Sequence, residues 1–363
     1  MKMLLLGDIS PTDVTAPLFK KEDVSGLFSN SLSIFENKDF VFANLECAIT
    51  ESDGKIAKYG PHLKAPYETA RVIKQVGIDC VGLSNNHVFD FGKKGMRDTL
   101  KALDDNGVLY TGFGDNYEDS RKNFVVEKDG EKITLIAVCE HEYSYALENR
   151  MGSRPYDEYD TMADIRKAKE TSDRVVVIYH GGKEFCKYPS PRLHKLCCAM
   201  VKNGADVVLC QHSHCIGCYE NYEGGHILYG QGNFHFVKPH TFEGWSTSLG
   251  VNYDTKNNKI EFVPLKNTDT GIELPDNDEQ VKILQEFEQR NQKLSNGEWR
   301  KCWNEFCEGV RDIYIGAVTR AFTETSSEFD DGVFSHYLDC EAHTDVWREL
   351  CPSFNLTNCM EEI

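Results

Sequence analysis

Residues 207–214 read VVLCQHSH, an apolar run that passes directly into two histidines. The run has the length and the β-branched content of a buried strand. Side chains two positions apart on an extended segment point to the same side, so His212 and His214 are expected to face one point. Neutral imidazole is a common metal ligand. This stretch therefore predicts a buried strand whose end delivers two candidate metal ligands.

Four other apolar runs end in the same way, in residues of the types that bind metals. Runs 2–6, 40–43, 80–83 and 175–179 end in Gly7-Asp8, Asn44-Leu45-Glu46, Ser84-Asn85-Asn86-His87 and His180-Gly181-Gly182. In α/β folds, functional groups collect where strands end and helices begin. Each ending alone also fits an ordinary polar turn. Five successive endings of this kind favour a site for Zn, Mn or Fe, which imidazole, carboxylate and amide donors suit.

Segments with helical spacing lie between several of these runs, and this alternation predicts an α/β core. They are residues 67–76, 94–105, 159–169 and 191–202. Residues 123–138 and 249–264 indicate β-hairpins. Beyond about residue 266 the chain changes to long helical segments without glycine-rich strand ends. We therefore expect one domain of residues 1–265 and a helical C-terminal extension of residues 266–363.

Charge and composition narrow the class of protein. The 363 residues include 40 basic and 58 acidic side chains, a formal net charge of −18. Such a surface repels nucleic acids and anionic membranes, but bound metal ions can still attract a phosphorylated substrate. The 14 cysteines are mostly scattered, as expected of reduced thiols in a cytoplasmic protein. The N-terminal MKMLLLGD is too short for a signal-peptide core, and no run approaches the ~18 residues of a membrane span.

The motifs, taken in order, resemble those of the CapA (poly-γ-glutamate capsule synthesis) family, within the calcineurin-like metallophosphoesterase superfamily. The series is Gly7-Asp8, Asn44-Leu45-Glu46, Asn85-Asn86-His87, His180-x-Gly182-x-Glu184 and His212-x-His214. The segments Asp90-Phe91-Gly92 and Tyr229-Gly230-x-Gly232-Asn233-Phe234 also look familial. The resemblance covers roughly residues 1–265. It implies a four-layer α/β sandwich of two mixed sheets flanked by helices, with the site at the strand ends.

The resemblance also implies a role for each matched residue. The metal ligands would be Asp8, Glu46, Asn86, His180, His212 and His214. Glu46 stands where the superfamily places a bridging aspartate, Asp8 and His214 would serve the first ion, and the other three the second. The catalytic residues would be His87, Asp90 and Glu184. Asp90 would orient His87 as general acid, and Glu184 would contact the substrate or support the ligands.

Two departures from the family pattern concern the first ion. The superfamily usually begins Asp-x-His, whereas Ser10 occupies the histidine position here, and the histidine pair lacks its usual preceding Gly-His. A hydroxyl is a poorer ligand than imidazole, so the first ion is expected to bind more weakly, giving one or two ions per chain. The alternative is that Ser10 caps the turn through its hydroxyl and that another residue replaces the lost ligand.

Several functions remain compatible with these residues. The first is a metal-dependent hydrolase that attacks a phosphoester with a metal-activated water. The second is synthesis or processing of poly-γ-glutamate by amide chemistry, with a γ-glutamyl small molecule or polymer as substrate. The third is metal-independent acid/base chemistry on a peptide, such as epimerisation. The last is a binding protein that keeps the fold of the family but has lost its catalytic activity. Metal content and an aryl-phosphate assay separate these hypotheses.

Overall fold

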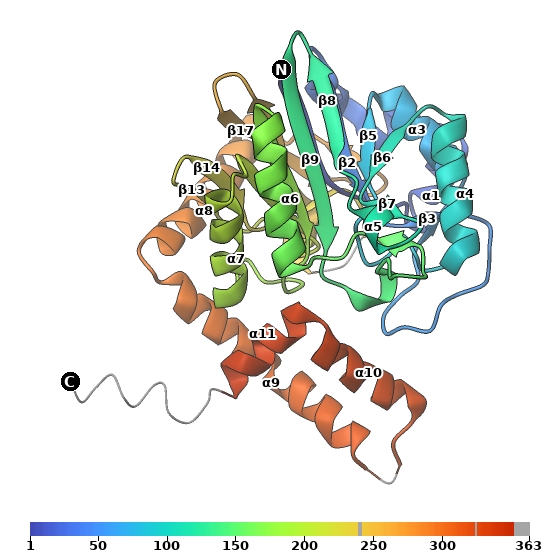
Figure 1. The fold of residues 1–363 in the computed structure, drawn as a ribbon, viewed down its shortest axis with the longest axis vertical. Coiled ribbons are helices and arrows are strands. Elements are labelled where there is room, and N and C mark those ends of the chain that lie inside the picture. Colours follow the sequence, from blue (N-terminus) through green and yellow to red (C-terminus); the bar gives the residue numbers. More distant parts are fainter. Residues whose placement is uncertain (239–241, 324, 352–363) are drawn as a thin grey trace.

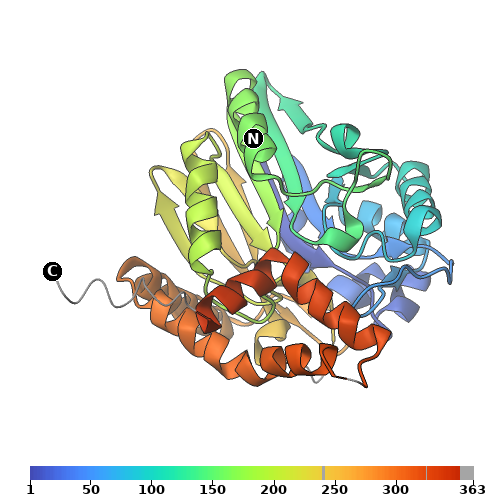
Figure 2. The same ribbon diagram turned by 60° about the horizontal axis from the view of Figure 1, so that its bottom comes forward.

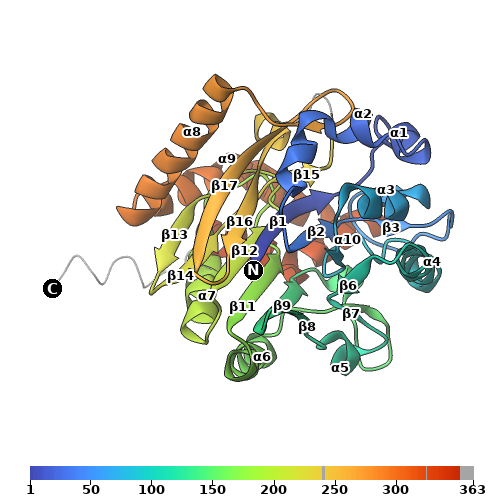
Figure 3. The same ribbon diagram turned by 90° about the horizontal axis from the view of Figure 1, so that it is seen from above.

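The fold consists of two β-sheets that face each other, with helices on both outer sides (Figures 1 and 3). The computed structural model describes residues 1–238, 242–323 and 325–351. Three apolar clusters separate the layers. Leu5, Phe42 and Ile178 belong to the cluster between the sheets, and the other two lie between each sheet and its helices. This arrangement confirms the expected four-layer α/β sandwich.

The first sheet is mixed and has eight strands in the order β18-β17-β16-β1-β2-β5-β6, with β15 paired to β1. They are β1 (Lys2–Ile9), β2 (Phe40–Leu45), β5 (Cys80–Gly82), β6 (Leu109–Thr111), β15 (Asn233–His235), β16 (Thr247–Asp254), β17 (Lys259–Asn267) and β18 (Ile272–Glu273). Strands β1, β2 and β5 are parallel. The register places Asp8 beside both Asn44 and Asn233, which brings the ends of β1 and β2 next to the start of β15.

The second sheet has six strands in the order β13-β14-β12-β11-β9-β8. They are β8 (Phe124–Lys128), β9 (Glu131–Cys139), β11 (Arg174–His180), β12 (Val207–Gln211), β13 (Tyr219–Tyr222) and β14 (Gly225–Leu228). Strands β9, β11 and β12 are parallel, so their carboxyl ends share one edge. Two small pairs complete the strands: β3 (Ala48–Ile49) with β4 (Lys64–Ala65), and β7 (Phe113–Gly114) with β10 (Gly152–Ser153).

The helices cover the outer faces of both sheets, and the predicted helices occur within a few residues of their expected bounds. They are α1 (Ala16–Lys20), α2 (Val24–Phe28), α3 (Glu68–Val76), α4 (Gly92–Asp105), α5 (Tyr117–Ser120), α6 (Glu158–Thr171) and α7 (Pro191–Lys202), with 3-10 turns η1 (Ser29–Phe35), η2 (Glu142–Ser144) and η3 (Glu243–Ser246). Gly77 has a φ of 97° at the end of α3, a left-handed conformation that glycine adopts readily. Both predicted hairpins form, as β8–β9 and β16–β17.

Four helices follow the sheets, of which the last three lie across the carboxyl ends of the strands, whereas the first runs beside β13 and β17 (Figures 1 and 2). They are α8 (Asn277–Ser295), α9 (Trp299–Ala321), α10 (Glu328–Asp339) and α11 (Glu341–Leu350). Their own apolar cluster includes Trp303, Tyr314 and Tyr337, and it also takes in Cys186 and Tyr59 from the α/β part. Strands β17 and β18 extend the first sheet to Glu273, so the helices begin at Asn277. The division into domains 1–265 and 266–363 stays a prediction.

Two further expectations from the sequence concern the cysteines and membrane-spanning helices, and both can be compared with the described part of the chain. The cysteines found there are all unpaired and most are buried, including Cys215 and Cys218 of the lone C-x-x-C. Among the helices of residues 1–238, 242–323 and 325–351, none combines the length and the apolar composition needed to cross a bilayer.

Candidate metal centre

Asp8, Glu46 and His180 converge where β1, β2 and β11 end. Each offers a ligand atom within 4.8 Å of the others, and all three side chains are buried. His180 Nδ1 lies 3.7 Å from Asp8 Oδ1, and its Nε2 lies 3.4 Å from Glu46 Oε1. The same Nε2 lies 2.9 Å from Asn86 Oδ1. Residues from both sheets therefore surround one small volume with oxygen and nitrogen donors.

A second group shares Glu46 with the first. Glu46, His212 and His214 also offer ligand atoms within 4.8 Å of one another. The ring centroids of His180 and His212 are 5.1 Å apart, so the two groups adjoin. A carboxylate common to both fits the predicted bridging position. His180 falls in the group of Asp8, however, whereas the resemblance assigned it to the ion of His212.

The backbone at the histidine pair differs from the extended conformation expected there. Strand β12 ends at Gln211, and His212 and His214 have φ of 80° and 55°. The prediction that both rings point to one side because the segment is extended is therefore wrong in its reasoning. The two rings, with centroids 5.7 Å apart, reach Glu46 from a turn that leaves the strand. Left-handed backbone at two non-glycine residues is strained, and such strain concentrates at functional sites.

Glu46 is the observation that most favours a bound cation. It is fully buried, and neither carboxylate oxygen has a hydrogen-bond partner among the described residues. Burial raises the pKa of this carboxyl. A buried carboxylate without partners is costly, and a metal ion supplies the missing positive charge. His212 Nδ1 is likewise buried without a partner in that part of the chain. Residues Asp8, Glu46, Asn86 and the three histidines thus fit one or two divalent ions.

Asparagines hold the ligands in place. Asn44 Nδ2 donates to Asp8 Oδ1 at 2.7 Å and lies 3.2 Å from His180 Nδ1. Asn85 in turn donates to Asn44 Oδ1 at 3.1 Å. Burial, with the neighbouring Glu46, raises the pKa of Asp8 to about 6, and burial lowers the pKa of His180 to about 4. His180 is therefore neutral near pH 7, which is the form that binds metals.

His87 is held by a buried ion pair. Its Nδ1 lies 2.8 Å from Asp90 Oδ2 and donates to that carboxylate. Lys58 forms an ion pair with the same carboxylate, and its Nζ lies 3.1 Å from His87 Nδ1. Burial, followed by Lys58, lowers the pKa of His87, and Asp90 opposes this effect. Because Asp90 engages Nδ1, Nε2 is the ring nitrogen that stays available to a substrate. A proton donor positioned by Asp90 requires this arrangement.

Sequence reasoning missed Lys58 and His141. Lys58 lies in a loop without periodicity, although its side chain is only 2% exposed. The ring centroid of His141 lies 4.2 Å from that of His212, and its Nδ1 is buried without a partner in the described residues. A signal for His141 existed, because Glu140-His141 directly follows the apolar run of β9, like the other strand endings.

Ser10 follows β1 and is fully buried. Its hydroxyl oxygen has no hydrogen-bond partner among the described residues. The turn-capping role considered for Ser10 is therefore not found in the part of the chain that the structure describes. Its backbone N–H donates to His235 O at 3.0 Å, which fixes the chain next to Asp8.

Two cavities reach the centre, and Glu184 and His87 line both. One, of about 700 Å³, extends to His214. The other, of about 490 Å³, extends to Asn86, His141 and His212, and residues of α10 and α11 close its far side. Glu184 is half-buried, with Oε2 lying 3.7 Å from Lys183 Nζ. The predicted catalytic and ligand residues are thus gathered at one place, and their roles stay predictions.

The fold and the residues at its strand ends define a class, the metallophosphoesterase-like α/β proteins. A family model described as bacterial capsule synthesis protein PGA_cap matches residues 2–238. The chain therefore belongs to this family, and the resemblance found in the motifs is confirmed. The matched part contains every predicted site residue, whereas α8 to α11 lie outside it.

Two CapA proteins are relatives of this chain in sequence. The chain is 29% identical over 280 residues to a capsule biosynthesis protein CapA of Bacillus anthracis, covering 73% of this chain and 67% of the relative. It is 29% identical over 270 residues to a PGA biosynthesis protein CapA of Bacillus subtilis (strain 168), covering 72% and 70%. A hypothetical protein from Thermus thermophilus is similar in structure, with a TM-score of 0.44, 15% identity and coverage of 73% and 98%.

Proposed function

We propose that this protein is a metal-dependent hydrolase that cleaves a phosphoester at the strand-end centre. The observation that carries the proposal is the buried carboxylate of Glu46, whose two oxygens lack partners among the described residues. Asp8, Glu46 and His180 would hold one ion, with Asn86 beside His180, and Glu46, His212 and His214 would hold the other. When bound, the ions would supply Lewis-acid activation of a water and neutralise phosphoryl charge. Mn, Zn and Fe suit these donors.

The protein's own residues would orient the substrate and move the proton. Asp90 holds His87 through Nδ1, so His87 would present a proton on Nε2 to the departing oxygen. Burial and Lys58 lower the pKa of His87, and an anionic phosphoester beside the ring would favour its protonated form. Lys58 itself would attract the negative charge of the substrate into the cavity.

The second candidate is cleavage or transfer of a γ-glutamyl amide during capsule synthesis. The family description and the two CapA relatives favour it. Lys58 and Lys183 line the smaller cavity, and their charge would suit a carboxylate-rich chain on an otherwise acidic protein. Its many buried thiols would remain reduced in the cytoplasm, where we propose that it works.

One assay pair separates the two candidates. The metal-stripped protein is reloaded with Mn²⁺ and offered aryl phosphomono- and diesters in one series and short γ-glutamyl oligomers in the other. Phosphoester turnover that disappears in Glu46→Gln supports the first candidate. Cleavage of the oligomers alone, again lost in Glu46→Gln, replaces it with the second. Turnover that persists in the metal-stripped protein contradicts both.

A further inference from the structure

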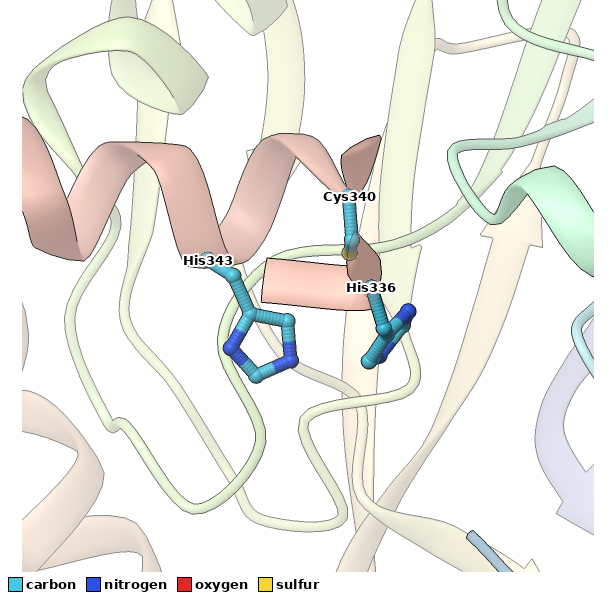
Figure 4. Close-up of side chains that lie close together, drawn as sticks. All are labelled: His336, Cys340 and His343. Carbon is cyan, nitrogen blue, oxygen red and sulfur yellow. The ribbon is translucent and has the colours of Figure 1, made fainter. Parts of the chain in front are cut away.

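The C-terminal helices carry a second cluster of metal-ligand residues, outside the family match. His336 lies on α10, Cys340 at the junction of α10 and α11, and His343 on α11, and the three side chains gather on one side of that junction (Figure 4). All three are buried, and each offers a ligand atom within 4.8 Å of the others. Two imidazoles and a thiol are a donor set that zinc prefers.

The outer partners of the two histidines match those of metal-bound imidazoles. His336 Nδ1 lies 2.7 Å from Glu142 Oε1, and His343 Nδ1 lies 2.6 Å from the Tyr314 hydroxyl. Histidines that bind a metal through one nitrogen almost always engage such a partner through the other. Both Nε2 atoms are thereby left to serve a common ion. The ring of Tyr337 stacks on His343 at 4.3 Å, which fixes its plane.

We propose that His336, Cys340 and His343 bind a zinc ion separate from the strand-end centre. The H-x3-C-x2-H spacing uses successive turns of two helices, so folding of the α10–α11 junction assembles the site. Three protein ligands leave one tetrahedral position open. Both histidines line the smaller cavity, and the ring of His336 lies 6.3 Å from that of His141. The open position therefore faces the same cavity as the strand-end centre.

Zinc binding at this cluster has a defined proton balance. The thiol of Cys340 loses one proton to solvent as its sulfur–zinc bond forms, and both histidines bind as neutral rings. Burial raises the pKa of Cys340 and lowers that of His343. The thiol must therefore be deprotonated as the metal binds. The inference does not depend on the proposed function, because the two sites share no ligand.

Cobalt substitution tests the site on the full chain. Co²⁺ bound to a thiolate gives a charge-transfer band in the near ultraviolet, and the strand-end centre has no cysteine among its candidate ligands. We expect this band on adding Co²⁺ to the metal-stripped wild type. It should persist in Glu46→Gln, which removes the other centre, and in Cys307→Ser, which changes another buried thiol of the same helical cluster. It should be lost in Cys340→Ser, together with one equivalent of zinc from the protein as purified.

Two variants complete the test. Cys198→Ser should keep the band, although Cys198 is the thiol of another candidate group, with His194 and Glu220. If Cys340→Ser does not fold by circular dichroism, His343→Gln provides the same test and should lose the same zinc equivalent. No band in the wild type, or a band that Cys198→Ser removes and Cys340→Ser retains, overturns the proposal.

Discussion

At the scale of single residues, a substitution of His87 tests whether this side chain donates a proton or binds the metal. If it donates a proton, His87→Ala should lose about 10²–10⁴ in turnover while the metal content stays near that of the wild type. Elemental analysis and steady-state kinetics on the same preparation measure both quantities. His226→Ala is the control, because His226 Nδ1 lies 2.8 Å from the Tyr219 hydroxyl, and His226 belongs to no candidate metal group among the described residues and lines neither cavity. Loss of metal in His87→Ala would make His87 a ligand instead.

We expect Ser10 to weaken the binding of the first ion. Its buried hydroxyl has no partner among the described residues, where the superfamily usually has a histidine ligand. We expect metal titration to resolve two affinities, the weaker of which strengthens in Ser10→His, and mild chelation to remove the weaker ion first. Ser10→Ala should leave both affinities unchanged. Two equally tight ions in the wild type would show that another residue has replaced the missing ligand.

His235 makes stability depend on pH through its burial. It is fully buried, its Nε2 lies 3.2 Å from Leu27 O, and its Nδ1 has no partner among the described residues. Burial lowers its pKa to about 4. As the pH falls below the unfolded value of ~6.5, the unfolded chain takes up a proton that the folded one refuses until about pH 4. The stability that His235 contributes above pH ~6.5 is therefore lost on acidification.

Urea unfolding of the metal-stripped protein measures this effect. Between about pH 7.5 and pH 5 the wild type should lose roughly 2 kcal/mol more than His235→Gln, whose amide cannot take up the proton. Near pH 7.5 the free energy of unfolding should change with pH by the same amount in both proteins. Equal losses in both proteins would mean that His235 is not held neutral.

At the scale of elements, the close approach of β1 and β15 fixes Asp8. A Cβ added at Gly7 would lie 2.2 Å from the backbone oxygen of Gly232, so one strand must move. Gly7→Ala should cost roughly 1–3 kcal/mol of stability and weaken metal binding, because Asp8 moves with the strand. Thermal unfolding and metal titration measure the two effects. Gly54→Ala, where an added Cβ would meet only ordinary contact, is the control; identical behaviour of both variants would contradict the argument.

The strands and most helices could be predicted because their signals are local. Apolar runs and helical spacing placed β1, β11 and α7 within a few residues. The candidate ligands followed because parallel strands bring their ends together. Lys58 could not be found in this way, since its loop carries no periodicity and its contact with Asp90 exists only in the folded chain. The left-handed backbone at His212 has no sequence signal of the kind that glycine would give.

At the scale of the whole molecule, the placement of the C-terminal helices could not be predicted from the sequence. Their helical character was predicted, but nothing local indicated that His336 and Tyr337 would close a cavity that also contains His212. Packing against Tyr59 and Cys186 sets this arrangement, and those contacts join residues far apart in the chain. The family-matched part and the extension thus share one cavity.

The central claim is that a divalent ion binds at the strand ends around Glu46. Crystals of the full chain grown with Mn²⁺ test it directly, because manganese-specific anomalous scattering locates the ion and manganese disfavours the thiolate cluster on α10 and α11. We predict a peak about 2.0–2.4 Å from a Glu46 oxygen and from nitrogens of His180 or His212. Crystals that show no such peak, with these side chains hydrogen-bonded only to one another or to water, would contradict the claim and leave metal-independent acid/base chemistry as the better account.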